Sequence, residues 1–365
     1  MCGRRWDSAS RSRGKRNSRS AAARCRVTFP RPAAKPRRTV RGASVSVRTP
    51  ATPPRLAAGK FRDPNITAKG ERRATVAPTG LDTLWVNTGT LCNITCANCY
   101  IESSPRNDAL TYISAAEVKA YLDEAEARGE PLREVGFTGG EPFMNPDLLP
   151  MLAEVLSRPG LTAIVLTNAM QPMRRYAKGL LALRDRFGTD RLTLRVSLDH
   201  HEAAHHDVER GEGSFAKTLE GLAWLAREGF GLHVAGRATF GGEDEATMRA
   251  GFARLFAEHG IPVDAADPVA LMLFPEMDAA ADVPEITEAC WGILHKSPES
   301  VMCASSRMVV KRKGAARPAV VACTLLPYDP QFELGASLSE AMRPVALNHP
   351  HCARFCVLGG AACSR

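Results

Sequence analysis

The chain has 365 residues, of which 44% are hydrophobic and 6% aromatic, an ordinary composition for a globular protein. Its net charge of +9 is misleading, because residues 1–60 hold 17 Lys or Arg against one acid, Asp7, leaving 31 basic and 38 acidic residues elsewhere. The part predicted to fold is therefore acidic, which argues against nucleic-acid binding there. No run approaches the roughly 18 apolar residues that a membrane-spanning helix needs, and no apolar secretory signal is visible.

Residues 1–70 form a basic tail that we expect to be disordered. The tail is rich in Arg, Ser, Ala and Pro and has no sustained apolar period, so it cannot bury enough surface to offset its ordering entropy. It is compatible with phosphate contacts to nucleic acid, with an organellar transit peptide, or with an over-extended gene start. We favour the last interpretation: no Met lies between Met1 and Met144, so the start would be a non-Met codon such as that of Val45 or Val47.

From Leu81 onward, short apolar runs alternate with amphipathic stretches. The predicted strands are residues 82–87, 134–138, 162–167, 192–198, 232–238 and 269–274. The predicted helices are residues 114–128, 145–157, 173–186, 214–228 and 245–258. Ser114 and Glu117 form a capping box for the first helix, and Asn145 and Pro146 are predicted as N-cap and first residue of the second.

Six strand–helix units at a spacing of roughly thirty residues predict a parallel sheet, because parallel neighbours need crossover helices. Periodicity does not distinguish an open sheet from a curved one.

Three cysteines, Cys92, Cys96 and Cys99, follow the first predicted strand in the pattern Cys-x3-Cys-x2-Cys. Three thiolates on one short loop can converge on a metal cluster, and a fourth coordination position stays open because the loop holds no fourth Cys or His. The alternative, a structural zinc site, is disfavoured because such a site takes four protein ligands.

The segments CNITCANCY and GFTGGEPF, about forty residues apart, resemble the radical S-adenosylmethionine (SAM) superfamily. The resemblance implies that Cys92, Cys96 and Cys99 hold a 4Fe-4S cluster whose fourth iron binds the amino and carboxylate groups of SAM. It also implies a partial (β/α)6 TIM-like barrel over residues 81–280, with the chemistry at the C-terminal strand ends. The match departs at Asn98, where the family often has an aromatic residue, whereas Tyr100 keeps an aromatic common in the peptide-modifying branch.

Further SAM contacts are implied at the strand ends, by Gly139, Gly140, Glu141, Pro142, Thr167, Asn168, Ser197, Asp199 and Arg237. Glu141 is a candidate acceptor near the cationic amine of SAM. Ala169 replaces the glycine of the Thr-Asn-Gly that the family often has. Arg237 has two interpretations, a partner of the SAM carboxylate or an ordinary barrel ion pair.

The run from His200 to Asp207 could hold a second metal, but we expect a solvated loop. Its continuation, Arg210-Gly211-Glu212-Gly213-Ser214-Phe215, resembles the RG-x-G-x-F entry to the next helix in radical SAM peptide-modifying enzymes. Asp199 and His200 remain candidates for substrate contact.

Residues 285–365 form a cysteine-rich extension with a predicted hairpin, 308–311 and 318–324, and a helix near 339–343. It resembles the SPASM and Twitch extensions of radical SAM enzymes, which hold auxiliary clusters. Five cysteines compete for about four ligand positions of one auxiliary 4Fe-4S cluster, with zinc as the alternative. We rank Cys303 behind the other four, Cys323, Cys352, Cys356 and Cys363. Cys290, beside Trp291, is expected to pack as a small apolar residue.

The sequence thus predicts an oxidoreductase-type radical SAM enzyme that reductively cleaves SAM to a 5′-deoxyadenosyl radical and removes hydrogen from a substrate. A peptide or protein substrate fits the C-terminal extension best. The alternatives are a radical SAM enzyme acting on a small metabolite or RNA, and a non-enzymatic iron-sulfur or zinc protein. Flavodoxin or ferredoxin is implied as reductant. The clustered cysteines favour metal binding in a reducing cytoplasm over a disulfide framework, and neither a membrane nor nucleic acid is expected as a partner.

Overall fold

The computed structural model describes residues 54–238, 243–275 and 277–359. The parallel strands of its barrel are β2 (Thr83–Asn87), β3 (Glu134–Thr138), β4 (Thr162–Thr167), β5 (Leu192–Ser197), β6 (Gly231–Arg237) and β7 (Leu271–Phe274). The helices between them are α1 (Ala115–Ala127), α2 (Leu148–Ser157), α3 (Gln171–Arg175), α4 (Ala177–Phe187), α5 (Ala203–Arg210), α6 (Ser214–Arg227) and α7 (Glu245–His259).

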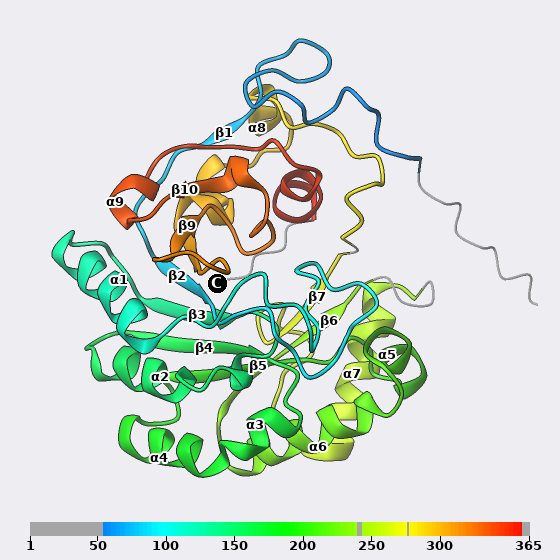
Figure 1. Ribbon diagram of the computed structural model, residues 1–365. Helices are drawn as coiled ribbons and strands as arrows, with labels where there is room; N and C mark the ends of the chain where they lie inside the picture. The colour runs from blue at the N-terminus through cyan, green and yellow to red at the C-terminus, as the bar shows by residue number, and fades with distance from the viewer. Residues whose placement is uncertain (1–53, 239–242, 276, 360–365) are drawn as a thin grey trace, which may run out of the picture. The chain divides into compact units, whose positions relative to one another are not determined.

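Strands β2 to β7 pair in chain order, each parallel to the next, and the connecting helices lie on one side of the sheet (Figure 1). This arrangement is the predicted partial (β/α)6 barrel. It brings the loops that follow the strands to one edge, so residues far apart in sequence meet there.

Local signals predicted the helix boundaries unevenly. The capping box of α1 is confirmed, since the Ser114 side chain accepts from Glu117 N and the Glu117 carboxylate accepts from Ser114 N. The expected cap at Asn145 is wrong, because Asp147 is the N-cap of α2. Asn145 instead donates to the backbone oxygens of Thr88 and Ile113, so it ties the loop after β2 to the start of α1.

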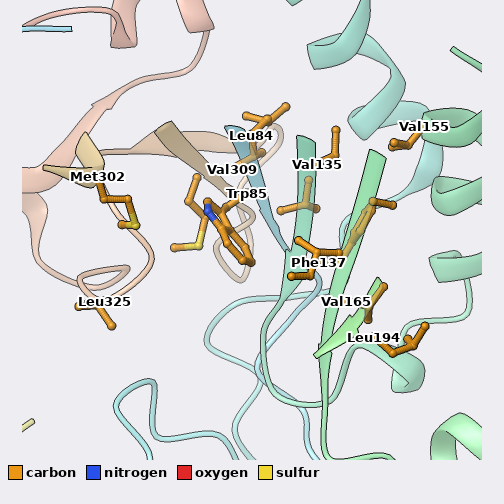
Figure 2. Packing of buried hydrophobic residues seen from close by; sticks show 14 of the residues in the cluster. Leu84, Trp85, Val135, Phe137, Val155, Val165, Leu194, Met302, Val309 and Leu325 are labelled. Atoms are coloured by element: carbon orange, nitrogen blue, oxygen red, sulfur yellow. The ribbon is translucent and has the colours of Figure 1, made fainter. Parts of the chain in front are cut away.

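The barrel core is built around β2, whose Trp85 is fully buried. Figure 2 shows Trp85 between Met302 and Leu325 on one side and Phe137 on the other. The neighbouring strand residue is Gly136, and a Cβ there would lie 2.4 Å from the indole ring. Since only glycine avoids this clash, Gly136 makes room for Trp85. Trp85 in turn packs between the barrel core and the C-terminal extension (Figure 2).

The C-terminal extension continues the barrel sheet. Strand β8 (Ser306–Val310) pairs in parallel with β2, and β9 (Ala319–Val321) and β10 (Glu333–Gly335) add antiparallel strands beyond it. The predicted hairpin is therefore confirmed as β8–β9. The extension also contains α8 (Ala289–Ile293), α9 (Leu338–Ala341), β11 (Val345–Ala346), three short 3-10 helices and the π-helix Cys352–Leu358.

The predicted disorder of residues 1–70 is wrong for the part that the structure describes. Lys60 pairs with Asp282 at 2.7 Å, and the Glu285 carboxylate accepts from Phe61 N at 2.7 Å. Just beyond, strand β1 (Thr75–Val76) pairs with β11. The prediction failed because these contacts join residues more than 200 positions apart, which local composition does not reveal.

Truncation should locate the true boundary of the folded part. We expect a chain that begins at Pro54 to keep its melting temperature, whereas one that begins at Asp63 loses the Lys60–Asp282 pair and the packing of Phe61. The melting temperature of the shorter chain should therefore fall by roughly 3–8 °C. Circular dichroism melts of both chains would test this, and equal melting temperatures would contradict it.

Among the described residues, no helix combines the length and the apolar character needed to cross a membrane.

Candidate functional site

A cavity of about 450 Å³ opens at the C-terminal ends of the barrel strands. Its lining includes Cys92, Cys96, Cys99, Gly139, Gly140, Thr167, Asn168, Ser197, Asp199 and Arg237. The structure therefore brings together the three predicted cluster ligands and seven of the nine predicted SAM-binding residues.

The cysteine loop follows the C-terminal end of β2. Cys92 is buried, whereas Cys96 and Cys99 are half-buried. Burial raises the pKa of the Cys92 thiol to about 12 and also raises that of Cys96, so neither would ionise at neutral pH without a cation beside it. A bound metal displaces such protons, and the donor set fits a cluster held by three thiolates.

Gly139 and Gly140 follow β3 and approach the cysteine loop closely. A Cβ on Gly139 would lie 2.5 Å from the Gly89 oxygen, and one on Gly140 would lie 2.2 Å from the Leu91 oxygen. Gly139 also has φ +140°, a conformation that side chains rarely adopt. The two glycines thus let the ends of β2 and β3 share one wall of the cavity.

Glu141 and Pro142 lie behind that wall and are not among the lining residues. The Glu141 carboxylate accepts from Thr167 Oγ1 and Asn168 N, both at 2.8 Å, so it fixes the turn after β4. Burial raises its pKa to about 7, against the opposing effect of these hydrogen bonds.

The raised pKa of Glu141 predicts a pH-dependent loss of stability. Its folded pKa lies above the ordinary value of 4.5, so its contribution is fully present below pH 4.5 and is lost as pH rises through 7. The shift corresponds to about 3 kcal/mol. Urea-unfolding midpoints of wild type and Glu141→Gln at pH 5 and pH 8 would test this, and the variant should lose less stability between the two. Equal losses in both proteins would contradict the assignment.

The turn after β4 is held in a conformation that glycine would favour. Ala169, where the resemblance predicts glycine, has φ +56°. Its amide donates to Thr167 Oγ1 at 3.0 Å, and Asn168 Nδ2 donates to Asn93 Oδ1 at 2.8 Å. Asn168 thereby links the turn to the cysteine loop and leaves Thr167 on the cavity wall.

Asp199 and Arg237 belong to a network of buried charges. Arg210 donates to both oxygens of Asp199, at 2.6 and 3.0 Å, and Arg237 donates to Glu209 at 2.8 Å. Although burial opposes it, Arg210 holds the pKa of Asp199 below its ordinary value. The ion-pair interpretation of Arg237 is thus realised, while its position on the lining leaves a contact with SAM as a prediction.

Sequence reasoning missed Glu209 and Trp85. Glu209 is 3% exposed. Trp85 lines the cavity, and its Nε1 has no hydrogen-bond partner among the described residues. Glu209 precedes the Arg210-Gly211 pair that the motif singled out, but its contacts join residues 111 positions apart and leave no local signal.

The histidine run is not the expected solvated loop. Residues 203–210 form α5, and His200 is fully buried, with a pKa lowered to about 4 by burial and by the nearby His201 and His205. His200 Nδ1 accepts from Glu202 N, so in the neutral ring Nε2 carries the proton and faces Glu243 at 3.7 Å. This tautomer argues against metal ligation by His200 Nε2, although His200, His201 and Glu243 lie close together.

A second set of thiols surrounds a small apolar cavity of about 20 Å³ in the extension. Cys303, Cys323, Cys352 and Cys356 all line it. Burial, together with the other three thiols, raises the pKa of Cys352 well above its ordinary value. Cys303, ranked last from the sequence, is therefore a full member of the set, while Cys363 lies outside the described residues. Cys290 packs against the core and contacts Thr287 through its sulfur.

The extension reaches the barrel cavity. Thr324, Leu325 and Phe355 line it, and Phe355 stacks on Phe274 of β7 at 5.5 Å between ring centroids. Leu325 lines both cavities, and Phe355 lies on the π-helix between Cys352 and Cys356. The two cavities, each lined by one thiol set, are therefore neighbours at Leu325.

Comparisons with known proteins agree with this geometry. Residues 86–251 match the model of the Radical SAM superfamily. The chain is 34% identical over 145 residues to the antilisterial bacteriocin subtilosin biosynthesis protein AlbA of Bacillus subtilis (strain 168), covering 40% of this chain and 30% of AlbA. It is 34% identical over 140 residues to the GTP 3′,8-cyclase of Rhodococcus opacus (strain B4), covering 38% of each. Both matches span well under half of the relative's length.

The fold is also similar to the crystal structure of Streptococcus suis SuiB bound to S-adenosylmethionine. The TM-score is 0.51 at 13% identity, over 71% of this chain and 64% of SuiB. The matched residues 86–251 contain the cysteine loop and the ends of β3, β4, β5 and β6, which together form the cavity. Residues 86–251 are therefore similar to the radical SAM superfamily both in sequence and in the cavity that they form.

Proposed function

We propose that this protein is an oxidoreductase-type radical SAM enzyme that cleaves SAM reductively and removes hydrogen from a peptide or protein. One observation carries the proposal: three thiols of one short loop line the same cavity as the C-terminal ends of β3, β4, β5 and β6. When bound, a 4Fe-4S cluster and SAM supply a 5′-deoxyadenosyl radical that abstracts hydrogen. The protein's part is to hold both and to exclude water.

Each wall of the cavity has a separate task in this proposal. Cys92, Cys96 and Cys99 would hold the cluster. The backbone around Gly139 and Gly140 lies close to the loop and offers peptide groups to the amino-acid part of SAM. The polar ends of β4 and β5 provide hydrogen-bonding groups for the rest of SAM, and the paired charges around Asp199 keep the site neutral enough to bind a sulfonium cation.

The extension completes the cavity on the substrate side. Leu325 and Phe355 of the extension, together with Phe274 at the end of β7, give the cavity an apolar wall. Such a wall excludes water from a reactive radical and can pack against a side chain. The similarity to AlbA, a bacteriocin biosynthesis protein, supports a peptide substrate, while the similarity to GTP 3′,8-cyclase keeps a small metabolite as the second candidate.

We further propose that Cys303, Cys323, Cys352 and Cys356 hold an auxiliary 4Fe-4S cluster in a SPASM/Twitch-like extension. Arg307 supports an anionic group there: it is 1% exposed, its hydrogen bonds go to backbone oxygens, and it lies near Cys303 and Cys323. Among the described residues no carboxylate forms an ion pair with it, so thiolates are its natural counter-charge.

The proposal requires an external electron donor, for which a flavodoxin or ferredoxin in the cytoplasm is suited. The defining experiment uses anaerobically reconstituted protein reduced with dithionite and incubated with SAM. Liquid chromatography should detect 5′-deoxyadenosine and methionine in equal amounts. A protein that carries iron but releases neither would be a non-enzymatic iron-sulfur protein, and the proposed function would be wrong.

A further inference from the structure

The part of the cysteine loop between Cys96 and Cys99 is attached to the barrel through Asn98. The Glu209 carboxylate accepts from Asn98 N at 2.8 Å and from Asn98 Nδ2 at 2.9 Å. The Glu209 backbone oxygen accepts from Ala97 N at 2.8 Å. One residue of α5 therefore takes three hydrogen bonds from two successive loop residues.

Arg237 of β6 closes this arrangement from the other side. Its Nη2 donates to Glu209 Oε1 at 2.8 Å and to the Asn98 backbone oxygen at 3.2 Å. The Asn98 peptide is thus held at its N–H, its carbonyl and its side chain. Since Glu209 is 3% exposed, its own charge-assisted bonds to Asn98 and Arg237 are partly shielded from bulk water, which strengthens them.

The helix that carries Glu209 is itself firmly placed. Arg210 is bound to Asp199 by two hydrogen bonds at the end of β5. At the start of α6, Asp207 accepts from Gly213 N, Ser214 Oγ and Phe215 N. In contrast, the loop from Cys92 to Cys99 contains no helix or strand of its own. Figure 1 shows the loop segment, in cyan, near α5 and the ends of β6 and β7. Glu209 therefore attaches the second half of the loop, at Ala97 and Asn98, to the barrel.

We propose that Glu209 is a positioning residue that, through Asn98, sets the place and the electrostatic environment of Cys96 and Cys99. The inference rests on the proposed function, because its role is to hold the cluster loop against the SAM-binding strand ends. The Glu209 carboxylate, which accepts from both nitrogens of Asn98, also places a negative charge beside the loop, with Arg237 as its partner at 2.8 Å.

The test uses four variants of the reconstituted full chain: Glu209→Gln, Asn98→Ala, the double variant and Glu212→Gln. Glu212 is exposed and lies three positions after Glu209, so Glu212→Gln is the matched control. Glu209→Gln retains the size of the side chain but cannot accept from Asn98 N, Asn98 Nδ2 and Arg237 at once. The measured quantities are iron per chain, melting temperature, 5′-deoxyadenosine release and the midpoint potential of the EPR signal that SAM perturbs.

We expect Glu209→Gln to keep its iron and to lower kcat/KM for SAM cleavage by about 10- to 100-fold, since a small displacement of reacting groups has effects of this size. Loss of a negative charge should move the midpoint potential to a more positive value, because an anion near the cluster favours the oxidised state. The double variant should be no slower than the slower single variant, because both substitutions break one interaction. Glu212→Gln should match wild type in every measurement.

The outcomes separate this inference from the proposed function. If wild type releases no 5′-deoxyadenosine, the function itself fails. If wild type is active and Glu209→Gln equals Glu212→Gln in both kcat/KM and midpoint potential, Glu209 does not position the loop. A fall in iron and melting temperature with an unchanged potential in the iron-loaded fraction would indicate a merely structural role and would also overturn the inference. Effects of Glu209→Gln and Asn98→Ala that multiply in the double variant would contradict their coupling.

Discussion

Replacing Cys92, Cys96 and Cys99 together with alanine should abolish SAM cleavage and leave about four irons per chain at the second thiol set. The three residues are the thiols that line the barrel cavity, and no His or fourth Cys of the same loop can substitute for them. The free energy of binding a cluster is lost when its ligands are removed, but the barrel core does not depend on them. The melting temperature should therefore fall below that of the cluster-loaded wild type and equal that of the wild type without its cluster.

The measurement is iron analysis combined with 5′-deoxyadenosine release, wild type and variant being reconstituted side by side. Cys290→Ala is the matched control, because Cys290 packs against the core away from both cavities and should leave iron and cleavage unchanged. Cleavage that survives in the triple variant would overturn the assignment of the loop. Complete loss of iron would mean that the second set does not hold a cluster.

Strand–helix periodicity was sufficient for the parallel order of the strands, since crossover helices connect them, whereas the closure into a partial barrel was expected only from the family resemblance. The predicted strands 134–138 and 162–167 coincide with β3 and β4, and the others agree within two residues. The same reasoning failed where tertiary contacts decide the structure. Asn145 has the sequence features of a helix cap, but its side chain donates hydrogen bonds to two distant backbone oxygens.

The candidate site was predictable to the extent that its residues follow strands. Thr167, Ser197 and Asp199 lie at the ends of β4 and β5, so strand assignment alone brings them to one edge. Glu141 also follows a strand, but the sequence does not tell which way its side chain turns, and in the structure it holds the Asn168 turn.

Long-range partners left no signal in the sequence. Asn98 departs from the aromatic residue expected there, and the sequence offers no reason for it. The reason is structural, since its amide pairs with Glu209 on a helix that was itself predicted as a loop. The residue at this departure from the family pattern is thus explained by a partner that only the fold brings beside it.

In the second thiol set, the geometry differs from the order in which the sequence ranked the cysteine ligands. Cys303 and Cys323 come from the two ends of the β8–β9 hairpin, and Cys352 and Cys356 from the π-helix, so four thiols surround one cavity without Cys363. Four thiolates satisfy a 4Fe-4S cluster completely, which would leave no iron open to substrate. The wall shared with the barrel cavity, at Leu325, then suits a cluster that exchanges electrons with the substrate site.

We therefore expect about eight irons per chain in reconstituted wild type and no stoichiometric zinc. Cys303→Ala should retain about four irons, because its cluster loses one of four ligands in a buried apolar cavity, while Cys363→Ala should retain about eight. Iron and zinc analysis of the matched pair distinguishes the possibilities. Four irons with one zinc in wild type would identify a structural zinc site. Loss of four irons in Cys363→Ala, with none lost in Cys303→Ala, would restore the ranking made from the sequence.

The Cys303→Ala protein should still release 5′-deoxyadenosine from SAM, since its barrel cluster is intact, but it should no longer complete oxidation of a substrate.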